Sequence, residues 1–235
     1  MPFHIKQIGM LAMVLAVGCQ PGDRDRDLEA DRDAASDTVP TVAAQTHRQH
    51  VQDAMRDTRA RHETLGTRIS ERSEDTWDRL SNRASETWRE IESGLAGVRD
   101  DDPQTIHRNR EESARRLAEL EGEMAEEEVR ATRTPEELRE VAGEWFGRLE
   151  SDLARVEQGL LGQDQPWQLD LDRDDVRDLR ERLGEVRVEA ETAPPARDDF
   201  EERRDDVADD LGDLTRDIRE ARFHVEWGPR PSARR

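Results

Sequence analysis

Apolar residues recur at helical spacing through most of the chain after about residue 46. The first series steps by four and three residues, and its members are Val51, Met55, Thr58, His62, Leu65 and Ile69. The spacing then lengthens to eleven residues. Ile69, Leu80 and Ile91 are eleven residues apart, and so are Trp77 and Trp88. Eleven residues make three turns of about 3.67 residues each, so these side chains stay on one helix face. Because no proline interrupts residues 46–99, the pattern predicts one N-terminal helix about 80 Å long.

Helix caps and breaks divide the rest of the body into four shorter helices. Asp102 and Pro103 suit the N-cap and first position of one helix, and Thr134 and Pro135 repeat this pair for the next. Later breaks come at Gly162, at Pro194 and Pro195, and at Gly228. The predicted helices therefore cover 103 to about 132, 135–161, about 174–193 and about 200–226.

Each of these four helices carries one stripe that we expect to face a core. The stripe residues are Ile106, Arg110, Ser113, Leu117, Leu120, Met124; Leu138, Ala142, Trp145, Leu149, Leu153, Val156, Leu160; Val176, Leu179, Leu183, Val186, Ala190; and Phe200, Arg204, Val207, Leu211, Leu214, Ile218, Ala221, Val225. Short connections make consecutive helices antiparallel neighbours. The predicted fold is all-α: an elongated antiparallel helical bundle or coiled coil with one long N-terminal helix, formed by residues 46–226 and followed by a short basic tail, 227–235.

The first nineteen residues have the pattern of an export signal. Lys6 precedes an apolar run of ten residues, Ile8 to Val17, which is too short to span a bilayer. The run leads into Leu-Ala-Val-Gly-Cys at positions 15–19, which resembles the lipobox of bacterial lipoproteins, with Ala16 where leucine is commonest. The resemblance implies a signal peptide over residues 1–18, cleavage before Cys19, and lipid attachment to the Cys19 thiol and the new amino terminus.

The residues after the cysteine are expected to form a tether. Residues 19–45 contain few apolar side chains, with Pro21, Gly22 and Pro40, and cannot bury enough surface to order themselves. In the lipoprotein family, aspartate after the acylated cysteine tends to retain the protein in the inner membrane. Gln20 stands there in this chain, so the resemblance implies an outer-membrane, periplasm-facing location.

Charge limits the partners of this protein. The 235 residues carry a net charge of −20, 40% of them are charged, and the mean hydropathy is −1.05. Such an acidic chain repels nucleic acid. Lys6 is the only lysine, so arginine paired with carboxylates is expected to cover the helices, a composition that also suits a salt-rich cell. The single cysteine permits no internal disulfide.

Two groups of residues have side chains of the kinds that bind metal ions. Asp170, Asp172 and Asp174 have the spacing that opens an EF-hand loop, but Asp175 occupies the position of the required glycine. An acidic N-cap for the following helix is the favoured interpretation. His47 and His50, with Asp53, share one helix side, and we interpret them as surface histidines at a fraying helix start. No metal and no cofactor are predicted.

No nucleophile elbow, free cysteine or glycine-rich phosphate loop is found in the body, so no catalytic residue and no enzymatic activity are predicted. Trp145 is interpreted as core, and Trp167 as a plug at the end of the bundle or a docking residue. The stripe with Trp77 and Trp88 has three interpretations: packing within the chain, an interface with a second protomer or another envelope protein, or a lipid-facing helix that resembles those of apolipoproteins.

The predicted function is that of a non-enzymatic envelope lipoprotein, a periplasmic spacer, scaffold or adaptor held to the membrane by lipids on Cys19. Its expected partners are the membrane, through this anchor, and an envelope protein or a second copy of itself. The alternative is a carrier or chaperone that binds a lipid or apolar ligand along the stripe with Trp77 and Trp88. Trp167 is the third candidate interaction residue.

Overall fold

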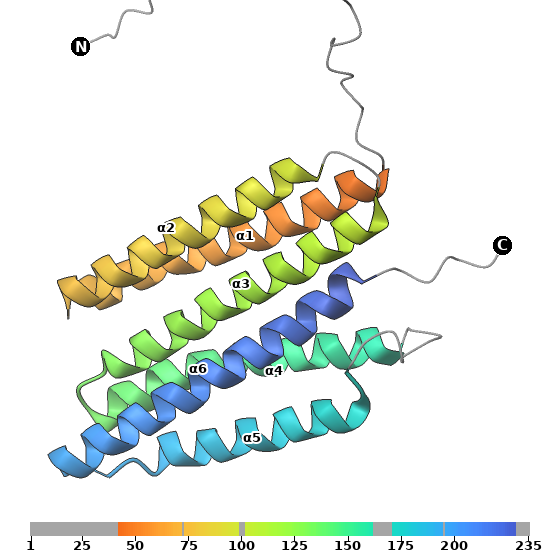
Figure 1. Ribbon diagram of the computed structural model, residues 1–235. Coiled ribbons are helices and arrows are strands. Elements are labelled where there is room, and N and C mark those ends of the chain that lie inside the picture. Colours follow the sequence, from red (N-terminus) through yellow and green to blue (C-terminus); the bar gives the residue numbers. More distant parts are fainter. Residues whose placement is uncertain (1–41, 72, 99–101, 162–170, 195, 229–235) are drawn as a thin grey trace, which may run out of the picture. The chain divides into compact units, whose positions relative to one another are not determined.

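The computed structural model describes residues 42–71, 73–98, 102–161, 171–194 and 196–228. Every regular element in these ranges is a helix (Figure 1): α1 (Val42–Ser70), α2 (Glu74–Gly97), α3 (Pro103–Arg130), α4 (Pro135–Leu161), α5 (Arg173–Glu191) and α6 (Arg197–Trp227). The all-α prediction is confirmed. The predicted signal peptide, Cys19, most of the predicted tether, Trp167 and the last seven residues lie outside the described ranges.

The prediction of one long N-terminal helix is wrong, because α1 ends at Ser70 and α2 returns antiparallel beside it. Residues 70–76 are all polar, so a helix continued through them would have no apolar side chain to bury. Ser73 is the N-cap of α2 instead, and its hydroxyl accepts a hydrogen bond from the Thr76 N–H at 3.3 Å. Glu74 and Asp75 place negative charge in the first turn of α2, where the helix dipole favours it.

The start of α1 is also earlier than predicted. The helix begins at Val42, inside the stretch that composition assigned to the tether. Ala44 and His47 are buried in its first two turns, so packing holds a segment whose own helical signal is weak. The body of the protein therefore includes residues that sequence reasoning left outside it.

The six helices form two three-helix bundles in chain order. Helices α1, α2 and α3 contact one another, and so do α4, α5 and α6. Within each bundle the first and third helices run parallel and the second runs antiparallel to both, as Figure 1 shows. The most extensive contact in the molecule joins the two bundles and lies between α3 and α6.

Two glycines allow α3 and α6 to approach closely at this junction. A Cβ atom added at Gly122 would lie 2.7 Å from the carbonyl oxygen of Gly212, and one added at Gly212 would lie 3.3 Å from the carbonyl oxygen of Gly122. Since the first distance is too short for a real Cβ contact, Gly122 is required for this separation of the two backbones. The junction thus depends on backbone packing as well as on side chains.

The predicted stripes form the core. Nearly all of their residues are buried, and Arg110, Arg204 and Val225 are the exceptions, each half-buried. A large apolar cluster extends through both bundles, including Leu120 and Leu211. A separate cluster contains Val51, Met55, Ile91, Leu95, Ala114, Leu117, Phe223 and Trp227. Each fully buried leucine or valine contributes about 1.5–3 kcal/mol relative to exposure, so these stripes are the main source of stability.

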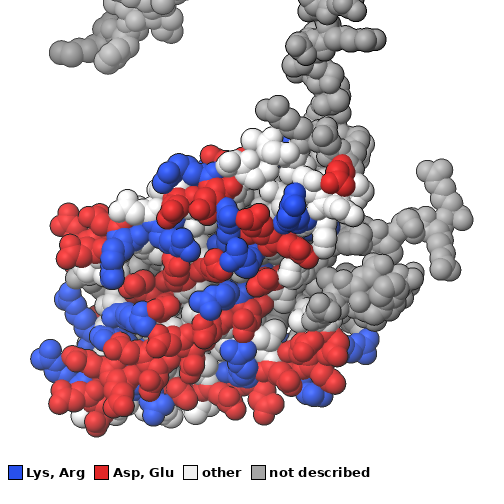
Figure 2. Space-filling model, viewed as in Figure 1, with Lys and Arg blue, Asp and Glu red and all other residues white. Residues whose placement is uncertain are grey.

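Charge is distributed unevenly over the helices. Residues 42–98, which include α1 and α2, contain ten acidic residues and nine arginines, whereas residues 171–228, which include α5 and α6, contain twenty acidic residues and eleven arginines. Figure 2 shows the consequence on one face, where red dominates over α5 and the start of α6. Residues 102–161 contain sixteen acidic residues and nine arginines, so the acidic excess of the helical body lies in α3 to α6 and is nearly absent from α1 and α2.

Candidate functional site

A layer of buried polar side chains crosses the junction between the two bundles. We call it the charge layer, and it consists of Thr58 and Arg61 of α1, Glu121 of α3, Asp152 of α4, and Arg219 and Arg222 of α6. It lies between the two main apolar clusters, because Met55 and Leu117 belong to one cluster and Leu65 and Met124 to the other. Four helices from both bundles therefore meet at charged groups.

Glu121 is fully buried at the centre of the charge layer. Its Oε1 accepts a hydrogen bond from the Thr58 hydroxyl at 2.6 Å and one from the Arg61 guanidinium. Its Oε2 lies 2.6 Å from Arg219 Nε, a charge contact without the alignment of a hydrogen bond. Burial alone would raise the pKa of Glu121, but Arg219 and Arg61 outweigh it and hold this pKa below its ordinary value. The carboxylate is therefore ionised.

Asp152 continues the layer into the second bundle. Its Oδ2 lies 2.6 Å from Arg219 Nη1, and its Oδ1 accepts a hydrogen bond from Arg222 Nη1 at 3.0 Å. Arg222 also donates from Nε to Glu226 at 2.8 Å. Burial lowers the pKa of Arg222, but Glu226 and Asp152 outweigh this effect and raise it. Glu226 at the edge of the layer adds a third carboxylate, so three arginines meet three carboxylates and the charges balance.

A cleft of about 560 Å³ opens onto the edge of the charge layer. Arg61, Arg222 and Glu226 belong to the network and also line the cleft, together with Arg155 and Trp227. Because the carboxylates of the layer already receive arginines, they are poor general bases and poor metal ligands. The arrangement is that of a structural ion network, which joins helices and leaves no carboxylate available for chemistry.

Glu128, seven residues after Glu121 on α3, is a second buried glutamate, and its charge is less fully compensated. Its Oε1 lies 2.8 Å from Arg68, and its Oε2 accepts a hydrogen bond from Trp145 Nε1 at 2.9 Å. Burial raises the pKa of Glu128, and Arg68 and Trp145 offset only part of this effect. Trp145 itself is buried in the core, as predicted.

Trp77 and Trp88 are half-buried within the first bundle and pack against the core. The imidazole of His62 lies between them, with ring centroids 4.4 Å from Trp77 and 5.2 Å from Trp88. Trp77 also covers Gly66, where a Cβ atom would lie 2.7 Å from its ring. Arg59 stacks on Trp88 at 4.9 Å from the ring centroid, a cation–π contact. These side chains therefore hold α2 against α1, as the interpretation of packing within the chain expects.

The interpretation of His47 as a surface histidine is wrong. His47 is 1% exposed, and its Nε2 lies 2.8 Å from Asn109 Oδ1 of α3. Burial lowers the pKa of His47, and the hydrogen bond with Asn109 offsets part of this effect. The side chain is thus a neutral core residue that joins α1 to α3.

The aspartates of the EF-hand-like stretch act as a helix cap where they are described. The Asp172 carboxylate accepts hydrogen bonds from the backbone N–H groups of Asp174 and Asp175, and the Asp175 carboxylate accepts one from the Asp172 N–H. This capping box confirms the N-cap interpretation. Asp170 lies outside the described ranges. Within the described parts of the chain, no group of three or more metal-ligating side chains occurs.

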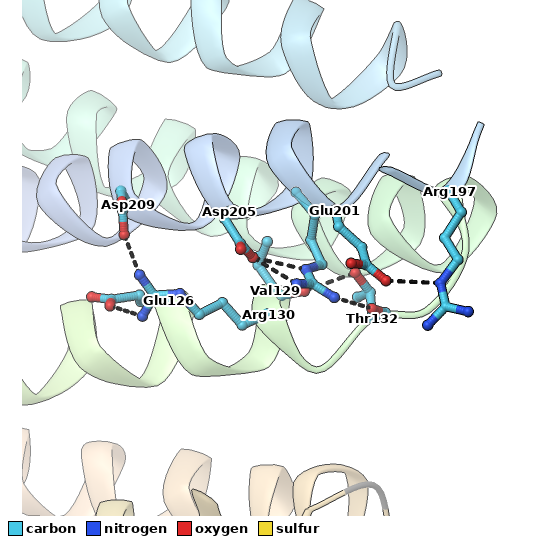
Figure 3. Close-up of polar contacts among 9 residues, drawn as sticks. Glu126, Val129, Arg130, Thr132, Arg197, Glu201, Asp205 and Asp209 are labelled. Atoms are coloured by element: carbon cyan, nitrogen blue, oxygen red, sulfur yellow. Dashed lines mark hydrogen bonds and ion pairs between the residues drawn. The ribbon is translucent and has the colours of Figure 1, made fainter. Parts of the chain in front are cut away.

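Ion pairs on the surface also bridge α3 and α6 (Figure 3). Arg130 contacts Glu126 of its own helix and Asp209 of α6, and Arg204 donates to the Thr132 carbonyl at 3.4 Å. Arg204 therefore stands on the predicted stripe because it binds the C-terminal end of α3, where the helix dipole favours a cation. Unlike the charge layer, these pairs are in contact with water.

Sequence reasoning missed the charge layer, although the signal is present. Glu121 and Glu128 each lie four residues from a stripe residue, Leu117 and Met124 respectively, and Arg219 adjoins Ile218. In a chain that is 40% charged, charged residues at this spacing look the same as the exposed flanks of a stripe. Their charged partners lie 60 to 98 residues away in the sequence, so no local pattern pairs them.

No family model matches this chain, and neither the curated proteins nor the solved structures contain a match. Among the residues that the structure describes, no helix combines the length and apolar character needed to cross a bilayer.

Proposed function

We propose that this protein is a non-enzymatic lipoprotein of the bacterial cell envelope, anchored by lipids on Cys19 and acting in the periplasm as a spacer, scaffold or adaptor. The observation that carries the proposal is the lipobox-like sequence at positions 15–19, which follows a short apolar run and precedes a strongly polar chain. More than one acyl chain gives stable anchoring, whereas one alone gives marginal binding. Gln20 favours the outer membrane as the destination.

The surface of the helical body supports a spacer or scaffold over a lipid carrier. Among the described residues, the large apolar side chains that are exposed are Val42, Leu161 and Val188, which lie on three different helices. A carrier needs a broad apolar face or cavity for its cargo. Trp77 and Trp88 instead pack against α1, and the clefts are lined largely by charged side chains.

Replacing Cys19 by serine tests the anchor. The variant is expected to move from the membrane fraction to the soluble periplasmic fraction, because the hydroxyl is not a substrate for lipid attachment. Gln20→Asp is the matched control, since it keeps the cysteine and is expected to stay with membranes while moving to the inner membrane. Persistence of Cys19→Ser in washed membranes would contradict the lipid anchor.

Photo-crosslinking in cells then separates the spacer from the adaptor. Probes belong at Val188 on α5 and Arg89 on α2, which are exposed on different bundles, with Trp88 as the partly buried reference. Repeated capture of one envelope protein from an exposed position identifies an adaptor and its partner. Capture confined to this chain supports a spacer, and capture of lipid would favour the carrier over our proposal.

A further inference from the structure

Arg110 of α3 is an arginine that has no counter-ion among the residues that the structure describes. Its Nε is buried without a hydrogen-bond partner, and among the described residues no carboxylate forms an ion pair with its guanidinium. Burial lowers the pKa of Arg110, and no acidic group opposes this effect. Removing a charge from water without a partner is unfavourable. The chain has 57 acidic residues that could pair with this arginine. The lack of such a pair indicates that the guanidinium is available to bind a ligand.

Arg110 lines a cleft of about 650 Å³ between α3, α5 and α6. This volume is in the range of roughly 300–1,000 Å³ that small-molecule sites occupy. Leu171, Leu179 and Ala221 contribute apolar surface to the cleft, and Asp178 and Glu220 contribute carboxylates from α5 and α6. The cleft thus has Arg110 on the α3 side and carboxylates on the α5 and α6 sides, besides Glu111 of α3 and Arg182 of α5.

Glu220 is another charged group of this cleft that has no ion pair among the described residues. It is half-buried on α6, and it makes no ion pair with Arg110 or with any other side chain in the described ranges. Neighbouring charges are already engaged: Asp217 pairs with Arg182 at 2.9 Å, and Glu111 pairs with His107 at 3.1 Å. One guanidinium and one carboxylate therefore line the same cleft, and each lacks a partner.

We propose that this cleft binds a small zwitterion, of the size of an amino acid or a short peptide, whose carboxylate is held by Arg110 and whose ammonium group is held by Glu220. The planar guanidinium suits a carboxylate because it donates two parallel hydrogen bonds. The apolar wall formed by Leu179 and Ala221 accommodates a small side chain. The site lies apart from the charge layer and does not depend on the proposed anchor at Cys19.

The probe is the dipeptide Ala-Ala, and binding is measured by titration calorimetry on the full chain carrying Cys19→Ser. The comparison ligand is acetyl-Ala-Ala-amide, which has the same backbone without either charge. We expect Ala-Ala to bind and the capped form to bind about 10- to 100-fold more weakly, the loss that missing charged hydrogen bonds produce. Equal binding of the two ligands, or no binding of Ala-Ala, would overturn the proposal without any further variant.

Variants then assign the two charges. Arg110→Gln and Glu220→Gln are each expected to weaken Ala-Ala binding by about 10- to 100-fold. Arg108→Gln, on the exposed side of the same helix, is the matched control and should bind as the parent does. Circular dichroism verifies that the variants remain helical. Unchanged binding by a helical Arg110→Gln variant would exclude Arg110 as the carboxylate anchor.

Discussion

Two glutamates lie one heptad apart on α3, and both are almost completely buried, yet their surroundings set opposite protonation preferences. Glu121 receives Thr58, Arg61 and Arg219, and its pKa is lowered. Glu128 receives only Arg68 and the Trp145 indole, and its pKa is raised. Burial is thus a poor guide to the state of a carboxyl, because the number of charged partners decides which effect is larger.

The difference also separates two roles in stability. Glu121 compensates a buried arginine that cannot leave its site, so removing the carboxylate leaves an unpaired charge in the core. In the pair of Glu128 with Arg68, burying the charge of Glu128 costs more free energy than burying that of Arg68. Arg68 is one-third exposed and also contacts Glu144 at 3.1 Å. Removing the charge of Glu128 therefore leaves no cation buried without a partner.

The largest effect is expected for Glu121→Gln. The substitution keeps the shape of the side chain but leaves Arg219 with Asp152 as its only carboxylate, so the free energy of unfolding should fall by about 3–5 kcal/mol. Urea denaturation followed by circular dichroism measures the change. A loss below about 1 kcal/mol would mean that the charge layer does not hold the bundles together.

A smaller loss is expected for Gly122→Ala at the neighbouring position. The added methyl would lie 2.7 Å from the Gly212 carbonyl oxygen, so α3 and α6 must separate, at a cost of about 1–3 kcal/mol. Gly143→Ala is the matched control, because nothing lies within 4 Å of its added Cβ and alanine favours a helix by up to about 1 kcal/mol. If both variants gained stability, the close approach of α3 and α6 would be refuted.

The smallest effect is expected for Glu128→Gln, and its sign depends on pH. A carboxyl whose pKa is raised by folding stabilises the protein most below its ordinary pKa of 4.5, and this contribution is lost as pH rises through the raised value. At neutral pH the neutral amide should match or exceed the parent by up to about 1 kcal/mol. The advantage should shrink as the pH approaches 4.5. Thermal unfolding at several pH values measures it, and a strong loss at neutral pH would contradict the comparison with Glu121.

The stripes were predictable because periodicity depends only on the local sequence. Leu149, Leu153 and Val156 recur at helical spacing, and they are buried as expected. The end of α1 at Ser70 was missed because an eleven-residue period continues past it from Ile69 to Leu80. The polar run before Trp77 and the Ser73 cap were the stronger signals, since a helix without an apolar face gains little from packing.

The buried charges could not be predicted from the same pattern. In the sequence, Asp152 looks like any acidic residue beside a leucine. Its partner Arg219 comes 67 residues later, and only the fold brings the two side chains together. The same holds for His47, whose partner Asn109 comes from another helix. Cys19 and Trp167 lie outside the described residues, so their roles remain predictions from sequence.

The antiparallel contact of α3 with α6 has a consequence for helix register. Slipping α6 along α3 by one turn, about 5.4 Å, would carry Arg219 away from Glu121 and Asp152 together. After such a slip the leucines would still contact apolar side chains. The buried charges of Arg219, Glu121 and Asp152 would instead lose their partners of opposite charge. The charge layer therefore discriminates against shifted alignments more than it adds to the strength of the correct one.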